Sequence, residues 1–195
     1  MKLGFVRHGE TDWNRQGILQ GQTDIPLNET GVLQARQLAE RLAQEEAIWD
    51  AIIASPLQRA YDTAAIISDK LNIPLLTADT RLQERGFGLV EGTNAEQRVA
   101  RFGKDWRDNA VKIGMESDEQ IWDRFQSFLA ELQQEEQPGN LLIVSHGSFL
   151  GAVLHLLCTN LEEERIDNLS YSIFQWDSSQ WSPLLYNCTR HLNKL

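Results

Sequence analysis

The stretch Leu3-Gly4-Phe5-Val6-Arg7-His8-Gly9-Glu10-Thr11 decides the fold. Its apolar half, Leu3–Val6, shows no alternation of apolar and polar residues, which is typical of a strand covered on both faces, as in a parallel sheet. The runs Ala51–Ala54 and Leu141–Val144 have the same character, and turn or polar residues bound each of them. The sequence therefore predicts three short buried strands.

Helices are expected between and after these strands. Apolar side chains at helical spacing, or a capping signal, mark four segments: residues 30–46, residues 58–71, a helix that follows the capping box Ser117-Asp118-Glu119-Gln120, and residues 147–158. Near the C-terminus, Ser172–Asp177 and Trp181–Asn187 flank a turn, which predicts a β-hairpin.

Alternating strands and helices closed by a hairpin predict an α/β fold. We expect three layers, α/β/α, around a mostly parallel central sheet with one antiparallel edge element. Residues 86–114 differ, because they hold five glycines and lack a core stripe. They are interpreted as a helical insertion over the carboxyl ends of the strands, within one domain that spans residues 1–195.

Composition and charge exclude several classes of protein. The 195 residues include 18 basic and 28 acidic side chains, a formal charge of −10 that argues against nucleic-acid or anionic-membrane partners. Two cysteines cannot build a disulfide framework, and no apolar run approaches the length of a membrane span. Arg7 and His8 interrupt the apolar N-terminus. We expect a cytoplasmic monomer or homodimer.

Cationic and imidazole side chains follow all three predicted strands. Arg7 and His8 follow the first, His146 follows the third, and Arg59 lies about one helical turn after the second. Ligands of open parallel sheets bind beyond the carboxyl ends of the strands, so these side chains should converge. Guanidinium groups suit phosphoryl oxygens, and Gly147 should open a helix whose N–H groups attract phosphate. An imidazole among arginines should stay neutral and nucleophilic.

A candidate proton donor lies in the glycine-rich segment Arg81–Gly88. Glu84 in this segment can protonate a leaving alkoxide and then return as base for an attacking water. Attack by His8 on phosphorus would give a phosphohistidine.

A row of basic residues in the insertion has two interpretations. Its members recur every third residue, at Arg98, Arg101, Lys104 and Arg107. The row either binds a second anionic group of the substrate or is a solvated face that balances nearby acidic residues.

Several ordered blocks resemble the signature of the histidine phosphatase superfamily, also called phosphoglycerate mutase-like. They cover most of the chain to about residue 157: Arg7–Thr11, Trp13-Asn14, Leu27–Gly31, Gln34-Ala35, Ser55–Ala60, Thr63-Ala64, Leu82–Glu84, Phe87-Gly88, Glu91-Gly92 and Val144–Gly147.

This resemblance implies roles for individual residues. It implies His8 as the phosphorylated nucleophile and Glu84 as the proton donor. It implies no metal and no cofactor, because arginines supply the positive charge. The remaining substrate ligands would be Arg7, Arg59 and His146 in the phosphate pocket, Asn14 as a further phosphate contact, and Arg85 and Gly147.

The resemblance leaves more than one reaction open. The mutases carry Glu-Arg-His-Tyr-Gly where this chain has Glu84-Arg85-Gly86-Phe87-Gly88, and they are usually longer. Both differences favour a phosphatase over a mutase, and the resemblance implies a metal-independent enzyme that hydrolyses a small phosphorylated metabolite. The alternatives are a phosphoglycerate mutase dependent on 2,3-bisphosphoglycerate, which Arg85 would suit, and a ribazole phosphate phosphatase of cobalamin synthesis. A silent phospho-ligand binding module should have lost His8 or Glu84.

Overall fold

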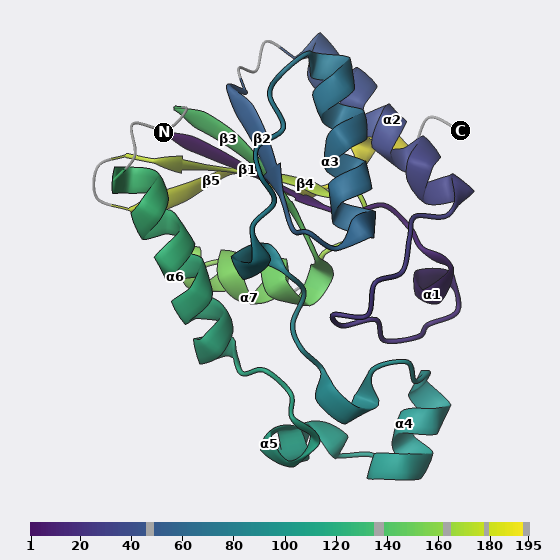
Figure 1. The fold of residues 1–195 in the computed structure, drawn as a ribbon. Coiled ribbons are helices and arrows are strands. Elements are labelled where there is room, and N and C mark those ends of the chain that lie inside the picture. The colour runs from purple at the N-terminus through teal and green to yellow at the C-terminus, as the bar shows by residue number, and fades with distance from the viewer. Residues whose placement is uncertain (46–48, 135–138, 162–164, 178–179, 193–195) are drawn as a thin grey trace.

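The computed structural model describes residues 1–45, 49–134, 139–161, 165–177 and 180–192. Five strands form one sheet in the order β2-β3-β1-β4-β5 (Figure 1). Strands β1, β2 and β3 are parallel, and the hairpin β4–β5 continues the sheet in antiparallel pairing beside β1. The predicted parallel sheet with an antiparallel edge element is confirmed. The strands are β1 (Lys2–Arg7), β2 (Ala51–Ala54), β3 (Asn140–Ser145), β4 (Tyr171–Trp176) and β5 (Trp181–Cys188).

Helices cover both faces of the sheet, which explains why its strands do not alternate. Phe5 belongs to a core shared with α6 and α7, whereas Val6 belongs to a core shared with α2 and α3. Successive side chains of a strand point to opposite faces, so both faces of β1 must be apolar. The three-layer α/β/α fold is confirmed (Figure 1). The helices are α2 (Glu29–Gln44), α3 (Gln58–Leu71), α6 (Asp118–Gln134) and α7 (Gly147–Leu157).

The helix ends agree with the predicted signals. The N–H of Gln120 donates to Ser117 Oγ at 3.2 Å and the N–H of Ser117 donates to Gln120 Oε1 at 2.9 Å, so the predicted capping box is present. Glu46, the expected end of the first helix, lies outside the described residues. No helix in the described ranges is long and apolar enough to cross a membrane.

The insertion consists of short helices with a small core of their own. Phe87, Val90, Trp106 and Ile113 are buried together. In Figure 1, α4 and α5 lie at the bottom of the view, apart from the helices that cover the sheet. The expected helical insertion is therefore present, and its core comes from separate short segments rather than from one stripe. These segments include the 3-10 turns Gly88–Val90 and Trp106–Asn109, α4 (Ala95–Phe102) and α5 (Ala110–Ile113).

The loop after β1 packs tightly against the first turn of α2. A Cβ added to Gly31 would lie 2.1 Å from the carbonyl oxygen of Glu10, and one added to Gly9 would lie 2.6 Å from the carbonyl oxygen of Gly31. The N–H of Asn28 donates to Glu10 O at 3.0 Å, and its Oδ1 accepts from the N–H of Gly31 at 2.8 Å. Glycine at both positions permits this close backbone approach, which holds the chain directly after His8.

We predict that Gly31→Ala lowers the free energy of unfolding by about 1–3 kcal/mol, because backbone must move to admit the methyl group. Urea unfolding measures this change. Gly151→Ala is the matched control, since Gly151 also lies in a helix but a Cβ there meets no atom within 4 Å. The control should gain up to about 1 kcal/mol from the helix preference of alanine. Equal effects of the two substitutions would contradict the packing argument.

Candidate active site

His8 is held as a neutral imidazole whose Nε2 makes no hydrogen bond to the described residues. Its Nδ1 lies 2.7 Å from the carbonyl oxygen of Gly9, and because that oxygen can only accept, Nδ1 carries the proton. Burial, followed by the charges of Arg59 and Arg7, holds the pKa of His8 well below its usual value. The sequence argument named the cations, but burial is the larger cause. Nε2 of the neutral ring therefore keeps its lone pair for attack on an electrophile.

His146 lies beside His8, with 5.1 Å between the two ring centroids. Its Nε2 lies 2.8 Å from Ser55 Oγ, and its Nδ1 has no partner in the described part of the chain. Burial, then Arg59 and His8, holds the pKa of His146 well below its usual value. His146 is therefore neutral near pH 7, and a hydroxyl that donates to Nε2 leaves Nδ1–H as a donor for an anion.

Two buried arginines supply the positive charge of the site. Arg7 Nη1 donates to the carbonyl of Ile166 at 2.7 Å, and Arg59 donates to the carbonyls of Gly21 at 2.7 Å and Thr23 at 2.8 Å. Burial lowers the pKa of Arg7 to about 10 and also lowers the pKa of Arg59, so Arg7 remains a cation near pH 7. The Nε atoms of both arginines are buried and lack a partner among the described residues.

The carboxylate of Glu84 lies at the start of α7. Its Oε1 accepts from the N–H groups of Arg85 and Phe149, both at 2.8 Å, and its Oε2 accepts from the N–H of Ser148 at 3.2 Å. The N–H groups in the first turn of a helix attract anions, and here Glu84 occupies two of them. The expectation that this helix start presents its N–H groups to phosphate thus does not hold for Ser148 and Phe149.

Asn14 and Gly147 both line the cavity beside His8. Asn14 Oδ1 accepts from the N–H of Thr11 and from Asn168 Nδ2, each at 3.2 Å, and its Nδ2 makes no hydrogen bond to another described residue. A Cβ on Gly147 would lie 3.0 Å from Arg7 Nε. The absence of a side chain at this position gives the Arg7 guanidinium its room.

Arg59 and His146 are fully buried and do not line this cavity, although the ring of His146 lies beside that of His8. Arg85 does not line it either. Its Nε donates to Ser148 Oγ at 2.8 Å, its Nη1 donates to the carbonyl of Glu116 at 2.8 Å, and its Nη2 pairs with Asp118. The guanidinium is thus committed to protein groups rather than to a substrate.

The cavity beside His8 has a volume of about 490 Å³ and further cations on its wall. Arg98 and Arg107 line it, and their guanidinium groups lie 5.7 and 4.3 Å from the ring centroid of Trp106. Arg101 and Lys104, from the same basic row, are exposed and do not line it. Arg165 also lines the cavity, and its place there was not predicted, because no motif marks a position so distant from His8 in sequence.

A neutral histidine between buried cations, at the strand ends of an α/β sheet, is an arrangement suited to phosphoryl transfer. A sequence profile for the histidine phosphatase superfamily (branch 1) matches residues 3–189, so the chain belongs to that family. Its relatives include phosphatases of Bacillus subtilis and Hydrogenobacter thermophilus, which identifies the chain as a phosphoric monoester hydrolase.

Similar proteins include both sequences and solved structures. The chain is 38% identical over 192 residues to the uncharacterized phosphatase PhoE of Bacillus subtilis, covering 97% of this chain and 95% of the relative. It is 36% identical to the putative phosphoserine phosphatase 2 of Hydrogenobacter thermophilus, covering 100% and 96%. A mycobacterial glucosyl-3-phosphoglycerate phosphatase has a similar structure, with a TM-score of 0.81, 29% identity and coverage of 96% and 98%.

We predict that His8 makes the protein less stable as the pH falls below 6.5. The unfolded chain binds a proton at this histidine near pH 6.5, whereas the folded chain does so only at much lower pH. Below pH 6.5 the unfolded state therefore holds the extra proton, and the free energy of unfolding falls by about 1.4 kcal/mol per pH unit.

Urea unfolding of wild type and His8→Asn at pH 7.5 and 5.5 measures this effect. Asparagine does not titrate, so the variant should lose about 1.4 kcal/mol less than wild type between the two pH values. Equal losses would show that His8 is protonated in the folded state as readily as in the unfolded chain.

Proposed function

We propose that the protein is a metal-independent phosphatase that hydrolyses small phosphomonoesters through a phosphohistidine at His8. One observation carries the proposal: three buried nitrogens of the site, Arg7 Nε, Arg59 Nε and His146 Nδ1, lack a partner within the described residues. An unsatisfied buried donor costs about 1–3 kcal/mol. A phosphoryl group attached to His8 offers three oxygens as acceptors for these donors.

In the first proposed step, His8 Nε2 attacks phosphorus and the ester P–O bond breaks. Arg7, Arg59 and His146 stabilise the charge on the equatorial oxygens. The leaving oxygen takes a proton from Glu84. Oε1 of Glu84 already accepts two N–H groups and Oε2 accepts one, so Oε2 has the free position for the proton that is transferred.

In the second proposed step, Glu84 removes a proton from water, whose oxygen attacks the phosphohistidine. The P–N bond breaks, inorganic phosphate leaves, and His8 returns to its neutral state. The commitment of Arg85 to Ser148 and Asp118 favours this hydrolysis over the mutase alternative, in which Arg85 would bind a substrate carboxylate.

The cations on the cavity wall support a narrower substrate class. Arg98 and Arg107 line the same cavity as His8 and Glu84, and the field of Arg107 lowers the pKa of Arg98 after the larger effect of burial. An anion beside the two guanidinium groups would offset the repulsion that lowers the pKa of Arg98. We infer that preferred esters carry a second anionic group, such as a carboxylate, besides the phosphoryl group.

We predict that His8→Ala lowers the turnover of an aryl phosphate by at least about 10³-fold, because the covalent route is lost. Wild type should retain its activity in EDTA and should form an acid-labile, base-stable phosphoenzyme when rapidly quenched with ³²P-labelled ester. His155→Ala is the matched control, since His155 lies outside the cavity and should keep normal activity. Turnover by His8→Ala at the wild-type rate would refute the proposal, and isomerisation of phosphoglycerate that requires bisphosphoglycerate would favour the mutase.

We predict that Arg107→Ala lowers kcat/KM about tenfold for esters with a second anionic group and less than about threefold for matched esters without one. One charge-assisted hydrogen bond is worth about 1.5–3 kcal/mol in a buried site and less at this exposed one. Phosphoserine and phosphoethanolamine, which differ only by the carboxylate, measure the difference in the same assay. Arg101→Ala is the matched control, because Arg101 belongs to the same basic row but lies outside the cavity. Equal losses on both esters would remove the subsite.

A further inference from the structure

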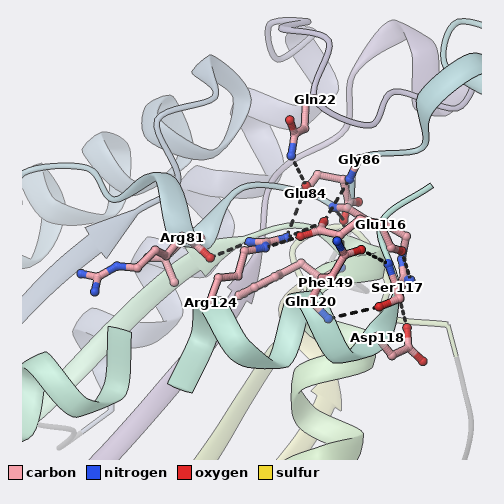
Figure 2. Close-up of polar contacts among 12 residues, drawn as sticks. Gln22, Arg81, Glu84, Gly86, Glu116, Ser117, Asp118, Gln120, Arg124 and Phe149 are labelled. Atoms are coloured by element: carbon pink, nitrogen blue, oxygen red, sulfur yellow. Dashed lines mark hydrogen bonds and ion pairs between the residues drawn. The ribbon is translucent and has the colours of Figure 1, made fainter. Parts of the chain in front are cut away.

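The segment that carries Glu84 is held by an arginine from α6. Arg124 Nη1 donates to the carbonyl oxygen of Arg81 at 2.5 Å, and Nη2 lies 3.5 Å from the carbonyl oxygen of Glu84 (Figure 2). The guanidinium carbon also lies 4.5 Å from the ring centroid of Phe149. Phe149 is the residue whose N–H donates to Glu84 Oε1 at 2.8 Å. One planar group thus contacts the backbone on the N-terminal side of Glu84 and the residue that binds its carboxylate.

Glu116 binds the backbone on the C-terminal side of Glu84. Its carboxylate accepts from Arg124 Nε at 2.7 Å and from Nη2 at 3.1 Å, a two-point ion pair. Glu116 Oε2 also accepts from the N–H of Gly86 at 3.1 Å, and the N–H of Glu116 donates to Gly86 O at 2.8 Å. Figure 2 shows the pair directly beside the segment from Glu84 to Gly86.

Partial burial strengthens the ion pair between Arg124 and Glu116. The side chains of Arg124 and Glu116 are each only 17% exposed, so water screens the pair far less than a surface ion pair. Bidentate guanidinium–carboxylate geometry also defines direction, which a lysine cannot do. Neither residue lines the cavity beside His8.

We propose that Arg124 and Glu116 are positioning residues that set the Glu84 carboxyl group for proton transfer to the leaving oxygen. The inference rests on the proposed role of Glu84 as general acid. Glu84 holds its position through backbone on both sides, with carbonyls bound by Arg124 and the N–H of Gly86 bound by Glu116. A general acid needs its proton within hydrogen-bond reach of the accepting oxygen, so a small displacement of this backbone weakens the transfer.

The test exploits the leaving group. Dinitrophenyl phosphate releases a stable anion that needs almost no proton, whereas phenyl phosphate of similar shape releases a strong base. The ratio of kcat/KM for dinitrophenyl phosphate to that for phenyl phosphate therefore reports proton donation in the first step. Glu84→Gln should raise this ratio about 100-fold, and Arg124→Ala should raise it about tenfold. A merely structural loss lowers both rates together and leaves the ratio unchanged.

Further variants separate position from stability. Arg124→Lys keeps the positive charge but cannot bind Glu116 and two carbonyls at once, so its ratio should also rise even if Arg124→Ala fails to fold. Glu116→Gln should raise the ratio, and combining it with Arg124→Lys should add little, because the two residues act as one unit. Arg81→Ala is the control: its side chain pairs with Asp79 and Glu131, and its ratio should match wild type.

The outcomes distinguish this inference from the proposed function. A raised ratio in Glu84→Gln with an unchanged ratio in Arg124→Lys and Glu116→Gln overturns the positioning role and leaves the phosphatase proposal intact. An unchanged ratio in Glu84→Gln overturns the acid role of Glu84 and the inference with it. A rise in Arg81→Ala equal to that in Arg124→Lys would also overturn the inference, since any loosening of the segment would then suffice.

Discussion

The parallel pairing of β1 with β3 is the constraint on which the site depends. The register places Arg7 opposite Ser145, the last residues of β1 and β3, so His8 and His146 follow the two strands at the same level. The N–H of His8 donates to Ser145 O at 3.0 Å, and the N–H of Ser55 donates to Val144 O at 3.0 Å. Three neighbouring strand ends therefore deliver a histidine, a second histidine and its serine partner to one edge of the sheet. A shift of one residue in this register would separate the two imidazoles.

Burial at this edge determines which groups are charged. Removal from water disfavours every cation, but the outcome depends on the starting pKa. The ordinary pKa of arginine lies far above neutral pH, so burial lowers the pKa of Arg7 only to about 10 and Arg7 keeps its charge. His8 titrates near neutral pH in water, so the same burial makes it neutral. The same desolvation thus produces fixed cations beside a neutral imidazole. The formal charge of −10 for the whole chain has no bearing on this local field.

Sequence patterns predicted the parts of the molecule that follow from local rules. Buried strands appear as continuous apolar runs, and the convergence of His8, His146 and Arg59 follows from parallel strands that share one edge. Contacts made by irregular segments obey no such rule. Arg85 and Glu84 are neighbours in sequence, yet Glu84 lines the cavity beside His8 and Arg85 does not. The basic row divides in the same way, since only two of its four members line the cavity.

The turn from β3 into α7 contacts both Arg7 and Glu84. Ser145 Oγ donates to the carbonyl of Leu82 at 2.8 Å, and this bond holds the segment that carries Glu84 against the end of β3. His146 follows, Gly147 leaves room for the Arg7 guanidinium, and the N–H groups of Ser148 and Phe149 bind Glu84. Since these residues are consecutive, the backbone of one turn sets the distance between His146, the proposed phosphate ligand, and Glu84, the proposed acid. Arg124 and Glu116 hold the opposite side of the same segment, so Glu84 lies between a strand end and an ion pair, each anchored in the fold.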